Sequence, residues 1–566
     1  MRNPFLKRKY RDYEIEPDQI FLDTINISQL NKQQFEGVIE RPISQKTLII
    51  LGAFFLLIFL FFCGRLFFLQ IVDGNSFLAQ SENNRLKRVP IFAERGVIYD
   101  RNNIEIAWNT DSGGQTPFSY RAYTKLSGHG HVLGYVNYPQ TDNAGNYWRT
   151  EISGQAGIEK KYNDVLAGVN GSRLIETDAL GHEISNSTIS NSMNGENIVT
   201  TIDTYLQHYL YEAIHKQAEE GGFQGGAGSI MDVHTGELIA FTSYPEFDPY
   251  TLAEGEDVEK IQEFFNDPRK PFLNRVLSGL YSPGSTVKPF LGLAALNEGL
   301  ITKDTTVLST GKIEIPNRFN PSEPSIFRDW RPQGHGITDI RHAIADSVNT
   351  FFYAIGGGWN GQEGLGIDRI EQYIKDFGIA QPTGIDFGNE AVGTIPSPEW
   401  KKETFADGTW RIGDTYITSI GQFGFQVTPI QMTRAMAAIA NNGILFEPLL
   451  IAGDSHSELV PDHISLDDYE LIRQALRDTV TKGIAAIINS QDVAMAAKTG
   501  TAQVGVDNEF YNSWVVGFFP YENPQYAFSI VMERGPDGGV GSAGRAMRDF
   551  IASVSVNYPE FWQNLQ

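Results

Sequence analysis

The stretch Tyr281-Ser-Pro-Gly-Ser285-Thr-Val-Lys288-Pro-Phe290 decides how the rest of the chain is interpreted. Its apolar continuation, residues 291–296, predicts a buried helix, and the Pro and Gly before Ser285 place that serine at or near the helix N-terminus. Ser285 and Lys288 are three residues apart, so they share one helix face. A lysine kept neutral by burial or by a neighbouring cation can take the proton of a serine hydroxyl, which is otherwise a poor nucleophile. The stretch therefore predicts a nucleophile and its base on one rigid element.

The serine–lysine spacing is a weak signal by itself. Ser309-Thr-Gly-Lys312 has the same spacing, but it leads into the alternating residues 313–316 and is typical of a surface strand beside a turn. The interpretation of Ser285 and Lys288 therefore depends on further motifs.

Two such motifs lie closer to the C-terminus. Ser347-Val-Asn349 follows the helical pattern of residues 338–346, and Lys498-Thr-Gly500-Thr501 follows an apolar run that predicts a strand. A Ser-x-Asn triplet alone means little, because residues 81–83 and 192–194 match it too, whereas Lys-Thr-Gly occurs once. The order S-x-x-K, S-x-N, K-T-G is the set carried by penicillin-interacting serine enzymes.

Composition excludes several other functions. The chain of 566 residues has room for several domains, and its net charge of −23 argues against nucleic acid as a partner. Its one cysteine, Cys63, excludes an intramolecular disulfide and any CxxC site, and the ten histidines show no HExxH spacing. We therefore predict no metal site and no cofactor.

An uncharged run at residues 48–64, extended by further apolar residues to about 70, is long enough to cross a bilayer. A cleaved signal peptide is the alternative, but the tail of residues 1–46 is too long for one. Arg41 and Lys46 flank the run and favour a cytoplasmic N-terminus. We expect a tail without regular structure at 1–46, a membrane helix at 47–70, and all that follows outside the cytoplasm.

The remaining chain divides into two parts. Residues 71–195 read as a small strand-rich module with a short helix around 158–166, and the Ser- and Asn-rich residues 185–197 read as a linker. Residues 196–566 predict an α+β domain whose sheet is completed by strands from both ends, with a large helical insert. A final helix is expected after Gly544.

Local signals support individual elements of the second part. Asp203 can cap a helix that runs to about Ala218, and residues 228–242 have a hairpin pattern. Residues 428–431, Thr-Pro-Ile-Gln, form a capping box with proline at the first helical position.

With these motifs in place, the sequence resembles the class B penicillin-binding proteins, specifically the elongation-type penicillin-binding protein 2 group. The resemblance runs from the membrane segment to near the C-terminus. Beyond the three motifs it rests on residues 64–70, Arg95–Arg101, Thr201–Gln207, Ser243–Pro249, Asp329-Trp330 with Gly334-His-Gly336, Thr383–Asp386 and Thr428–Gln431.

The resemblance implies the penicillin-recognising transpeptidase fold on a pedestal of the dimerisation type, and a membrane-anchored peptidoglycan D,D-transpeptidase. Ser285 would be the nucleophile and Lys288 its proton acceptor. Ser347 would relay a proton to the leaving group, Asn349 would hold the substrate backbone, and Lys498 would supply positive field that helps to keep Lys288 neutral.

The same resemblance implies how the substrate is held and what else the protein meets. Thr499, Gly500 and Thr501 would bind the terminal carboxylate, and the backbone N–H groups of Ser285 and Thr501 would form the oxyanion hole. The acyl-enzyme would be released by an amine of a neighbouring strand. Implied partners are peptidoglycan stem peptides, β-lactams, the lipid bilayer, a glycosyltransferase of the SEDS family, and other elongation or division proteins, but no nucleic acid.

Three departures from the family pattern stand out. Only about thirty residues separate Asp100-Arg101 from residues 131–135, where the family has a longer insert. The family's Ile-Gly-Gln-Gly run is altered to Ile-Gly-Gln-Phe-Gly-Phe-Gln at residues 420–426. Asn349 stands where the elongation group often has Asp, which leaves elongation and division roles both open.

Two alternatives keep the fold and change the function. One is a β-lactam-hydrolysing or β-lactam-sensing enzyme. A hydrolase needs a positioned water, and the sequence shows no extra carboxylate motif that would hold one. The other is a non-catalytic cell-wall scaffold, against which the intact set of three motifs counts.

Overall fold

The computed structural model describes residues 44–77, 86–143, 145–177, 183–317, 320, 322–453, 455–460, 464–507, 509–536 and 541–565. The chain divides into two compact units. One holds residues 1–87 and 177–182, and the other holds residues 88–176 and 183–566. The tail expected at residues 1–46 lies, up to residue 43, outside the described residues.

The predicted apolar helix is present in the first unit. Helix α1 (Gln45–Phe67) continues as the π-helical η3 (Phe68–Val72), and Ser44 begins it by accepting a hydrogen bond from the Thr47 N–H. Together the 28 residues form the one helix, within the described part of the chain, that is long and apolar enough to cross a membrane.

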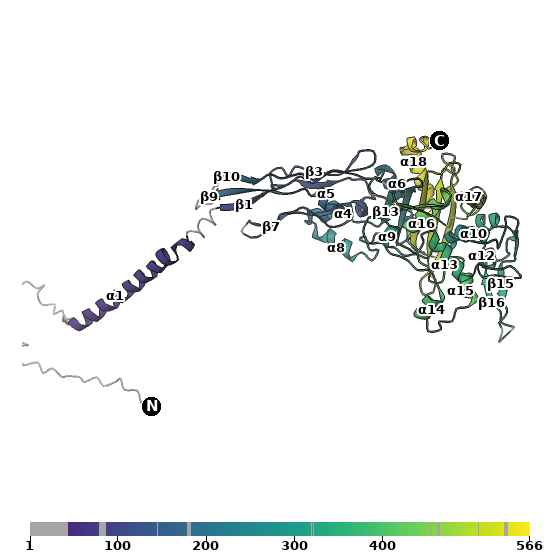
Figure 1. The fold of residues 1–566 in the computed structure, drawn as a ribbon, viewed down its shortest axis with the longest axis horizontal. Helices are drawn as coiled ribbons and strands as arrows, with labels where there is room; N and C mark the ends of the chain where they lie inside the picture. The colour runs from purple at the N-terminus through teal and green to yellow at the C-terminus, as the bar shows by residue number, and fades with distance from the viewer. Residues whose placement is uncertain are drawn as a thin grey trace, which may run out of the picture. The chain divides into compact units, whose positions relative to one another are not determined.

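The N-terminal part of the second unit is strand-rich, as predicted. It contains a three-stranded sheet in the order β1-β9-β10 and a four-stranded sheet in the order β11-β2-β3-β4. In Figure 1, β3 and β10 lie at one end of this unit and α10 and α12 at the other. The strands are β1 (Leu86–Ile91), β2 (Ile98–Tyr99), β3 (Glu105–Thr110), β4 (Tyr120–Tyr123), β9 (Gly171–Thr177), β10 (Glu183–Ser190) and β11 (Ile198–Val199).

The prediction of a linker at residues 185–197 is wrong for the first half of that range. Residues up to Ser190 belong to β10, which pairs with β9 although every one of its side chains is exposed. Strand pairing is made by backbone N–H and C=O groups, which polar side chains do not prevent. The short helix expected around 158–166 is present as two, α4 (Gly157–Lys161) and α5 (Asn163–Leu166).

A buried charge network holds this strand-rich part together. Glu159 on α4 is fully buried and accepts hydrogen bonds from Arg95 Nε at 2.6 Å and from Arg121 Nε at 2.7 Å. Arg95 also donates to the Glu159 carbonyl at 2.8 Å and to the Asn163 side chain at 3.1 Å. The Glu159 carboxylate thus balances the charges of two buried arginines, one in the loop after β1 and one on β4. These ion pairs hold α4 against the sheet.

The larger part of the unit is built on an antiparallel sheet that both ends of the domain complete, as predicted. Its order is β13-β12-β22-β21-β20, so the early hairpin pairs with a strand about 300 residues later, and Ser229 is opposite Ser529. The strands are β12 (Gly225–Asp232), β13 (Leu238–Tyr244), β20 (Ala496–Val504), β21 (Phe510–Phe519) and β22 (Tyr526–Pro536).

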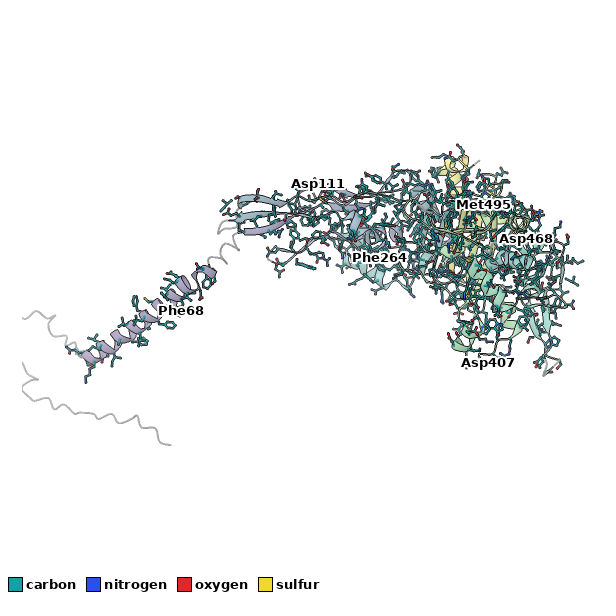
Figure 2. All side chains as sticks on the ribbon, in the orientation of Figure 1. Phe68, Asp111, Phe264, Asp407, Asp468 and Met495 are labelled. Atoms are coloured by element: carbon teal, nitrogen blue, oxygen red, sulfur yellow. The ribbon has the colours of Figure 1, made fainter. Side chains whose placement is uncertain are left out.

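Helices cover both faces of this sheet. On β21, Val515 belongs to one hydrophobic cluster and its neighbour Val516 to the other, which is the alternation of a strand buried on two sides. Helices α6 (Thr204–Gly221) and α18 (Ala543–Asn557) pack in the first cluster, and α16 (Pro429–Ala440) packs in the second. Met495, labelled in Figure 2, lies in the first cluster just before β20.

The predicted caps are present. Asp203 accepts hydrogen bonds from the N–H groups of Tyr205 and Leu206 at the start of α6, and Thr428 and Gln431 form the capping box of α16. The final helix begins at Ala543, slightly earlier than expected, because Ser542 accepts a hydrogen bond from the Arg545 N–H and caps it.

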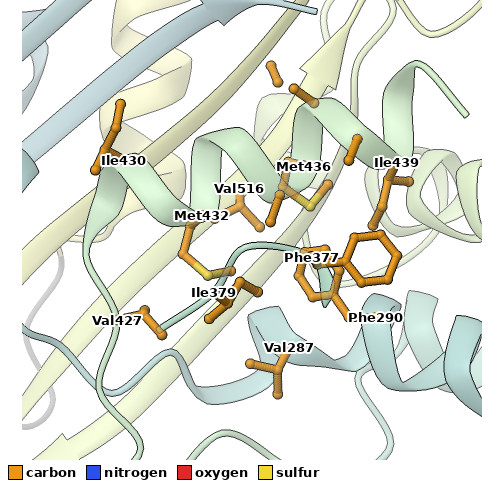
Figure 3. Close-up of a cluster of buried hydrophobic side chains, with 14 of the residues drawn as sticks. Val287, Phe290, Phe377, Ile379, Val427, Ile430, Met432, Met436, Ile439 and Val516 are labelled. Atoms are coloured by element: carbon orange, nitrogen blue, oxygen red, sulfur yellow. The ribbon is translucent and has the colours of Figure 1, made fainter. Parts of the chain in front are cut away.

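The second cluster anchors the helix α10 (Lys288–Asn297). Figure 3 shows Val287 and Phe290 facing Phe377 and Ile379, which lie between α10 and the Met432 side of α16. The rings of Phe290 and Phe377 are 5.0 Å apart, and all five side chains are fully buried. Close packing on every side leaves α10 little freedom to shift.

The remaining elements are mostly short, except for the 16-residue helix α17 and the 11-residue helix α13. The further helices are α3 (Gly130–Leu133), α7 (Pro249–Glu254), α8 (Val258–Asn266), α9 (Arg275–Ser278), η4 (Gly284–Val287), α11 (Ile340–Ala345), α12 (Asn349–Gly357), α13 (Gly366–Asp376), α14 (Pro398–Thr404), α15 (Ile412–Thr418), α17 (Leu466–Thr481), η5 (Ala486–Ile488) and α19 (Pro559–Gln563). The further strands are β5 (Val136–Asn137), β6 (Gln140–Thr141), β7 (Tyr147–Arg149), β8 (Ser153–Gly154), β14 (Val307–Ser309), β15 (Lys312–Ile315), β16 (Ser325–Arg328), β17 (Gly336–Thr338), β18 (Ile444–Phe446) and β19 (Ser457–Leu459).

The buried network predicts a large cost for removing its one negative charge. Glu159→Gln leaves Arg95 and Arg121 buried without a counter-charge and should lower the free energy of unfolding by about 3–5 kcal/mol. Thermal unfolding followed by circular dichroism measures the effect. Glu151→Gln, a change at an exposed glutamate of the same part, is the control; equal unfolding temperatures for the two variants would contradict the role of the network.

Candidate active site

The predicted nucleophile lies on a single helical turn. Residues Gly284–Val287 form the 3₁₀ turn η4, which passes directly into α10 at Lys288. Ser285 is half-buried, whereas the Lys288 side chain is fully buried. The predicted position of Ser285 at the start of a buried helix is confirmed. The surface position expected for Ser309 and Lys312 holds only for the lysine: Lys312 begins β15 with an exposed side chain, whereas Ser309 ends β14 buried and accepts a hydrogen bond from the Thr350 hydroxyl at 2.7 Å.

The Lys-Thr-Gly strand lies against this turn with no room to spare. A Cβ at Gly500 would lie 2.7 Å from the Pro283 carbonyl oxygen, and one at Gly284 would lie 2.8 Å from the Thr501 carbonyl oxygen. Gly284 also has φ +56°, a conformation that favours glycine. Both glycines are therefore required for β20 to approach the turn that holds Ser285.

Along β20 the motif alternates between the core and the open side. Lys498 and Gly500 are buried, whereas Thr499 is half-buried and Thr501 is exposed. Side chains two apart on a strand share a face, so the two threonine hydroxyls are presented on the same side.

Ser347 lies in the connection between α11 and α12 with a strained backbone. Its φ is +56°, a left-handed conformation that serine rarely adopts. Its N–H donates to the Ile344 carbonyl at 3.2 Å, and the Val348 N–H donates to the Ala343 carbonyl at 2.9 Å. Strain of this kind persists where the surroundings over-determine the conformation, which is common at functional sites.

Two buried lysines converge on Ser347. Lys288 Nζ lies 2.8 Å from the Ser347 carbonyl oxygen, 2.7 Å from Asn349 Oδ1 and 3.2 Å from Ser347 Oγ. Lys498 Nζ lies 2.9 Å from the same hydroxyl oxygen and 2.8 Å from the Thr499 carbonyl oxygen. The structure thus brings the three motifs into one hydrogen-bonded group. None of the three contacts of Lys288 is to Ser285.

Burial disfavours charge on both lysines. It lowers the pKa of Lys288 to about 7, with the Asp329 carboxylate acting in the opposite direction. Burial, and then the charge of Lys288, hold the pKa of Lys498 well below its usual range. Because both amines lie within hydrogen-bond distance of one hydroxyl, full protonation of both is strongly disfavoured near neutral pH.

Asp329 is a site residue to which sequence reasoning assigned no role. Its buried carboxylate accepts hydrogen bonds from the Thr350 N–H at 2.9 Å and the Thr350 hydroxyl at 3.1 Å, which fixes the first turn of α12. His335 Nε2 lies 3.3 Å from the other carboxylate oxygen. The sequence signal was the Asp-Trp pair followed by Gly-His-Gly, but its proximity to Lys288 depends on long-range folding.

The altered run at residues 420–426 contacts the turn that holds Ser285. The Gly421 carbonyl accepts a hydrogen bond from the Gly284 N–H at 2.9 Å. Phe423, the extra residue, has φ +66° and packs its ring 5.6 Å from Trp400, with Lys401 Nζ 5.5 Å above its face. The aromatic contacts offset the unusual backbone conformation of Phe423.

Among the residues that the structure describes, no group of three or more His, Cys, Asp or Glu side chains could hold a metal ion.

Two family models match the chain. The model of the penicillin binding protein transpeptidase domain covers residues 226–552, and that of the penicillin-binding protein dimerisation domain covers residues 116–200. The first match contains all three motifs of the site. The second match lies in the strand-rich part.

Relatives and solved structures agree with these models. The peptidoglycan D,D-transpeptidase MrdA of Escherichia coli is 30% identical over 592 residues, covering 86% of this chain and 90% of that protein. The structure of the Helicobacter pylori penicillin-binding protein PBP2 in complex with MreC matches with a TM-score of 0.68 at 26% identity, covering 84% of this chain and 100% of that one.

A third match is a chain of a peptidoglycan synthase complex that coordinates polymerization and crosslinking, with a TM-score of 0.69 and 25% identity over 89% of this chain and 98% of that one. The two family models together cover most of the second unit, and the E. coli relative aligns over nearly its full length. The chain therefore belongs to the penicillin-binding proteins and is a peptidoglycan D,D-transpeptidase.

Proposed function

We propose that this transpeptidase cross-links stem peptides through an acyl-enzyme on Ser285 and that β-lactams inhibit it at the same serine. The observation that carries the proposal is the convergence of Lys288 and Lys498 on the Ser347 hydroxyl, beside the turn that holds Ser285. A serine next to a base of lowered pKa, with a third group orienting that base, is the arrangement of an activated nucleophile.

The contacts of Lys288 favour its role as base. The Ser347 carbonyl and Asn349 Oδ1 can only accept, so they take the two N–H groups of a neutral Lys288 amine. Its lone pair then remains available for a hydroxyl proton. Ser285 precedes Lys288 by less than one helical turn, and the contact between them can form when the substrate binds.

Lys498 and Ser347 complete a path for the proton. Lys498 donates to the Ser347 oxygen, and the Ser347 hydroxyl can in turn donate to Lys288 or to a leaving amine. The proton taken from Ser285 thus reaches the departing amine while Ser285 Oγ bonds to the carbonyl carbon of the donor peptide. An amine of a second peptide then attacks the ester, forms the cross-link and frees Ser285.

The remaining motif residues bind the substrate in this proposal. The hydroxyls of Thr499 and Thr501 face the open side, where they can hold a terminal carboxylate in the field of Lys498. The bare backbone at Gly500 allows the strand to reach the nucleophile turn. The N–H groups of Ser285 and Thr501 serve as the oxyanion hole, and Asn349 orients the donor peptide.

Acylation by a β-lactam tests the nucleophile. Mass spectrometry of the full chain after treatment with fluorescent penicillin should place the adduct on the peptide that contains Ser285, and Ser285→Ala should remove it. Ser457→Ala, which changes an exposed serine at the start of β19, should label like the wild type. Undiminished labelling of Ser285→Ala would refute the proposal.

The two lysines should fail in different ways. Acylation needs neutral Lys288, whose neutral fraction rises as the pH passes upward through about 7, so the second-order acylation rate of the wild type should rise there as well. The acylation rate of Lys288→Arg should be lower by at least about 100-fold, because guanidinium cannot act as a base near neutral pH. Lys498→Arg keeps the charge and should retain slow acylation.

The measurement is the acylation rate of both variants from pH 5 to pH 9, with Lys312→Arg as the matched control. Equal rates for Lys288→Arg and Lys498→Arg would show that the base is assigned wrongly. A wild-type rate that stays flat through pH 7 would contradict the role of Lys288 titration.

The proposed arrangement in the cell follows the charges around α1. We assign residues 1–46 to a cytoplasmic tail, 47–70 to a single span of the cell membrane, 71–195 to the pedestal and 196–566 to the transpeptidase domain outside the cytoplasm. Protease added to intact spheroplasts should remove the large C-terminal part and spare the tail. The reverse pattern would refute this orientation.

A glycosyltransferase of the SEDS family is the proposed partner. The support is the match to a chain of a synthase complex that coordinates polymerization with crosslinking. Affinity purification of the full chain from detergent-solubilised membranes should recover such a polymerase, and its repeated absence would argue against the partnership.

A further inference from the structure

A concave site is formed in part by residues near the C-terminal end of the chain. It is a pocket of about 460 Å³, which we call the C-terminal pocket. Its lining comes from four segments that are distant in sequence: the pedestal, the start of α6, the turn between β21 and β22, and the residues around α19. These residues are Arg101, Asn102, Asp203, Leu206, Asn523, Gln525, Tyr526, Tyr558, Phe561, Asn564 and Leu565.

The pocket and the catalytic group belong to different sides of the sheet. Phe561 in the pocket wall packs in the same hydrophobic cluster as α6 and α18. Phe290, two residues after Lys288, packs in the other cluster, with α16. Figure 1 shows the C-terminus beside α18, whereas α10 and α12 lie in another part of the unit. A ligand in this pocket would therefore not compete for the space around Ser285.

The pocket lining is rich in side-chain amides whose hydrogen-bond donors and acceptors are not all used within the protein. In the described part of the chain, no hydrogen-bond partner is found for the side chains of Asn523 and Asn564, and both residues are exposed. Gln525 Nε2 donates to the Asn523 backbone carbonyl at 3.3 Å, which leaves the side-chain oxygen Oε1 of Gln525 available. Each amide offers a donor and an acceptor side by side, which suits hydroxyl and acetamido groups.

Aromatic rings form the apolar part of the wall. The Tyr558 and Phe561 rings are stacked with their centroids 6.2 Å apart, and the Tyr526 ring is 5.7 Å from Phe561. Tyr526 and Tyr558 are half-buried, so part of each ring borders the pocket. Ring faces next to polar groups fit a ligand with both C–H faces and hydroxyl edges, which is the character of a sugar ring.

The charges in the pocket are already balanced. Asp203 is occupied, because it caps α6 and accepts hydrogen bonds from Asn102 Nδ2 at 3.0 Å and from the Tyr558 hydroxyl at 3.2 Å. Arg101 lies 3.7 Å from the Glu237 carboxylate. With one cation opposed by two acids, the site offers no net positive charge to a phosphate or a nucleotide, and a neutral ligand is favoured.

We propose that the C-terminal pocket binds the amino-sugar glycan chain of peptidoglycan and so holds a strand whose peptides reach the catalytic site. The inference rests on peptidoglycan being the substrate, and not on the assignment of Ser285. Its contribution is to raise the local concentration of stem peptides around the catalytic site.

Glycan strands without peptides separate this site from the catalytic one. The full chain in detergent is first acylated with penicillin, and binding of amidase-treated, peptide-free glycan strands is then measured by calorimetry or microscale thermophoresis. The wild type should bind the strands in both the free and the acylated form. The double variant Asn523→Ala/Asn564→Ala should bind at least tenfold more weakly, since it removes two exposed amides without touching the core.

Asn489→Ala/Gln491→Ala, which removes two exposed amides elsewhere on the same unit, is the matched control and should bind like the wild type. Penicillin acylation should proceed equally in all variants, so a failure at Ser285 is distinguished from a failure at the pocket. Absence of binding by the wild type, loss of binding on acylation, or unchanged binding by the Asn523/Asn564 variant would each overturn the proposal. Binding of the isolated stem peptide in a manner sensitive to Asn523 would overturn the sugar assignment.

Discussion

Two fully buried lysine side chains share one serine hydroxyl, and the rest of the catalytic part is arranged around that constraint. Removing an ammonium group from water disfavours its charge, and a second ammonium group nearby disfavours it further. Burial acts on both lysines, and the charge of Lys288, which reaches the same Ser347 Oγ, acts in addition on Lys498. The shared hydroxyl therefore favours a state in which one amine is neutral and the other is charged.

That electrostatic arrangement depends on packing that keeps the amines in place. The helix that carries Lys288 is held by Phe290 against Phe377, in the cluster of Figure 3. The strand that carries Lys498 approaches so closely that Gly284 and Gly500 leave no space for a Cβ. A core substitution that adds or removes one methyl group would change the distance between the two lysine nitrogens, because a closely packed interior has no space to absorb it.

Local signals were sufficient for much of the fold. The caps at Asp203 and Thr428, the hairpin at residues 228–242 and the helix at Ser285 all depend on residues close in sequence, and the structure contains each of them. Sequence reasoning failed where pairing overrides composition, as in β10, whose Ser- and Asn-rich strand is stabilised by its neighbour.

Sequence reasoning also could not anticipate the environment of Lys288, because that environment is assembled from distant segments. Only the folded chain brings Asp329, Ser347 in its left-handed conformation and the Asn349 amide close to the Lys288 amine. The last of these gives the departure from the elongation-type pattern a physical meaning. A carboxylate at position 349 would place a negative charge where Asn349 Oδ1 now lies, 2.7 Å from Lys288 Nζ, and would favour the protonated lysine. With asparagine, the amine keeps its hydrogen-bond acceptor without that charge, so burial alone opposes Asp329 and keeps the pKa of Lys288 close to neutral.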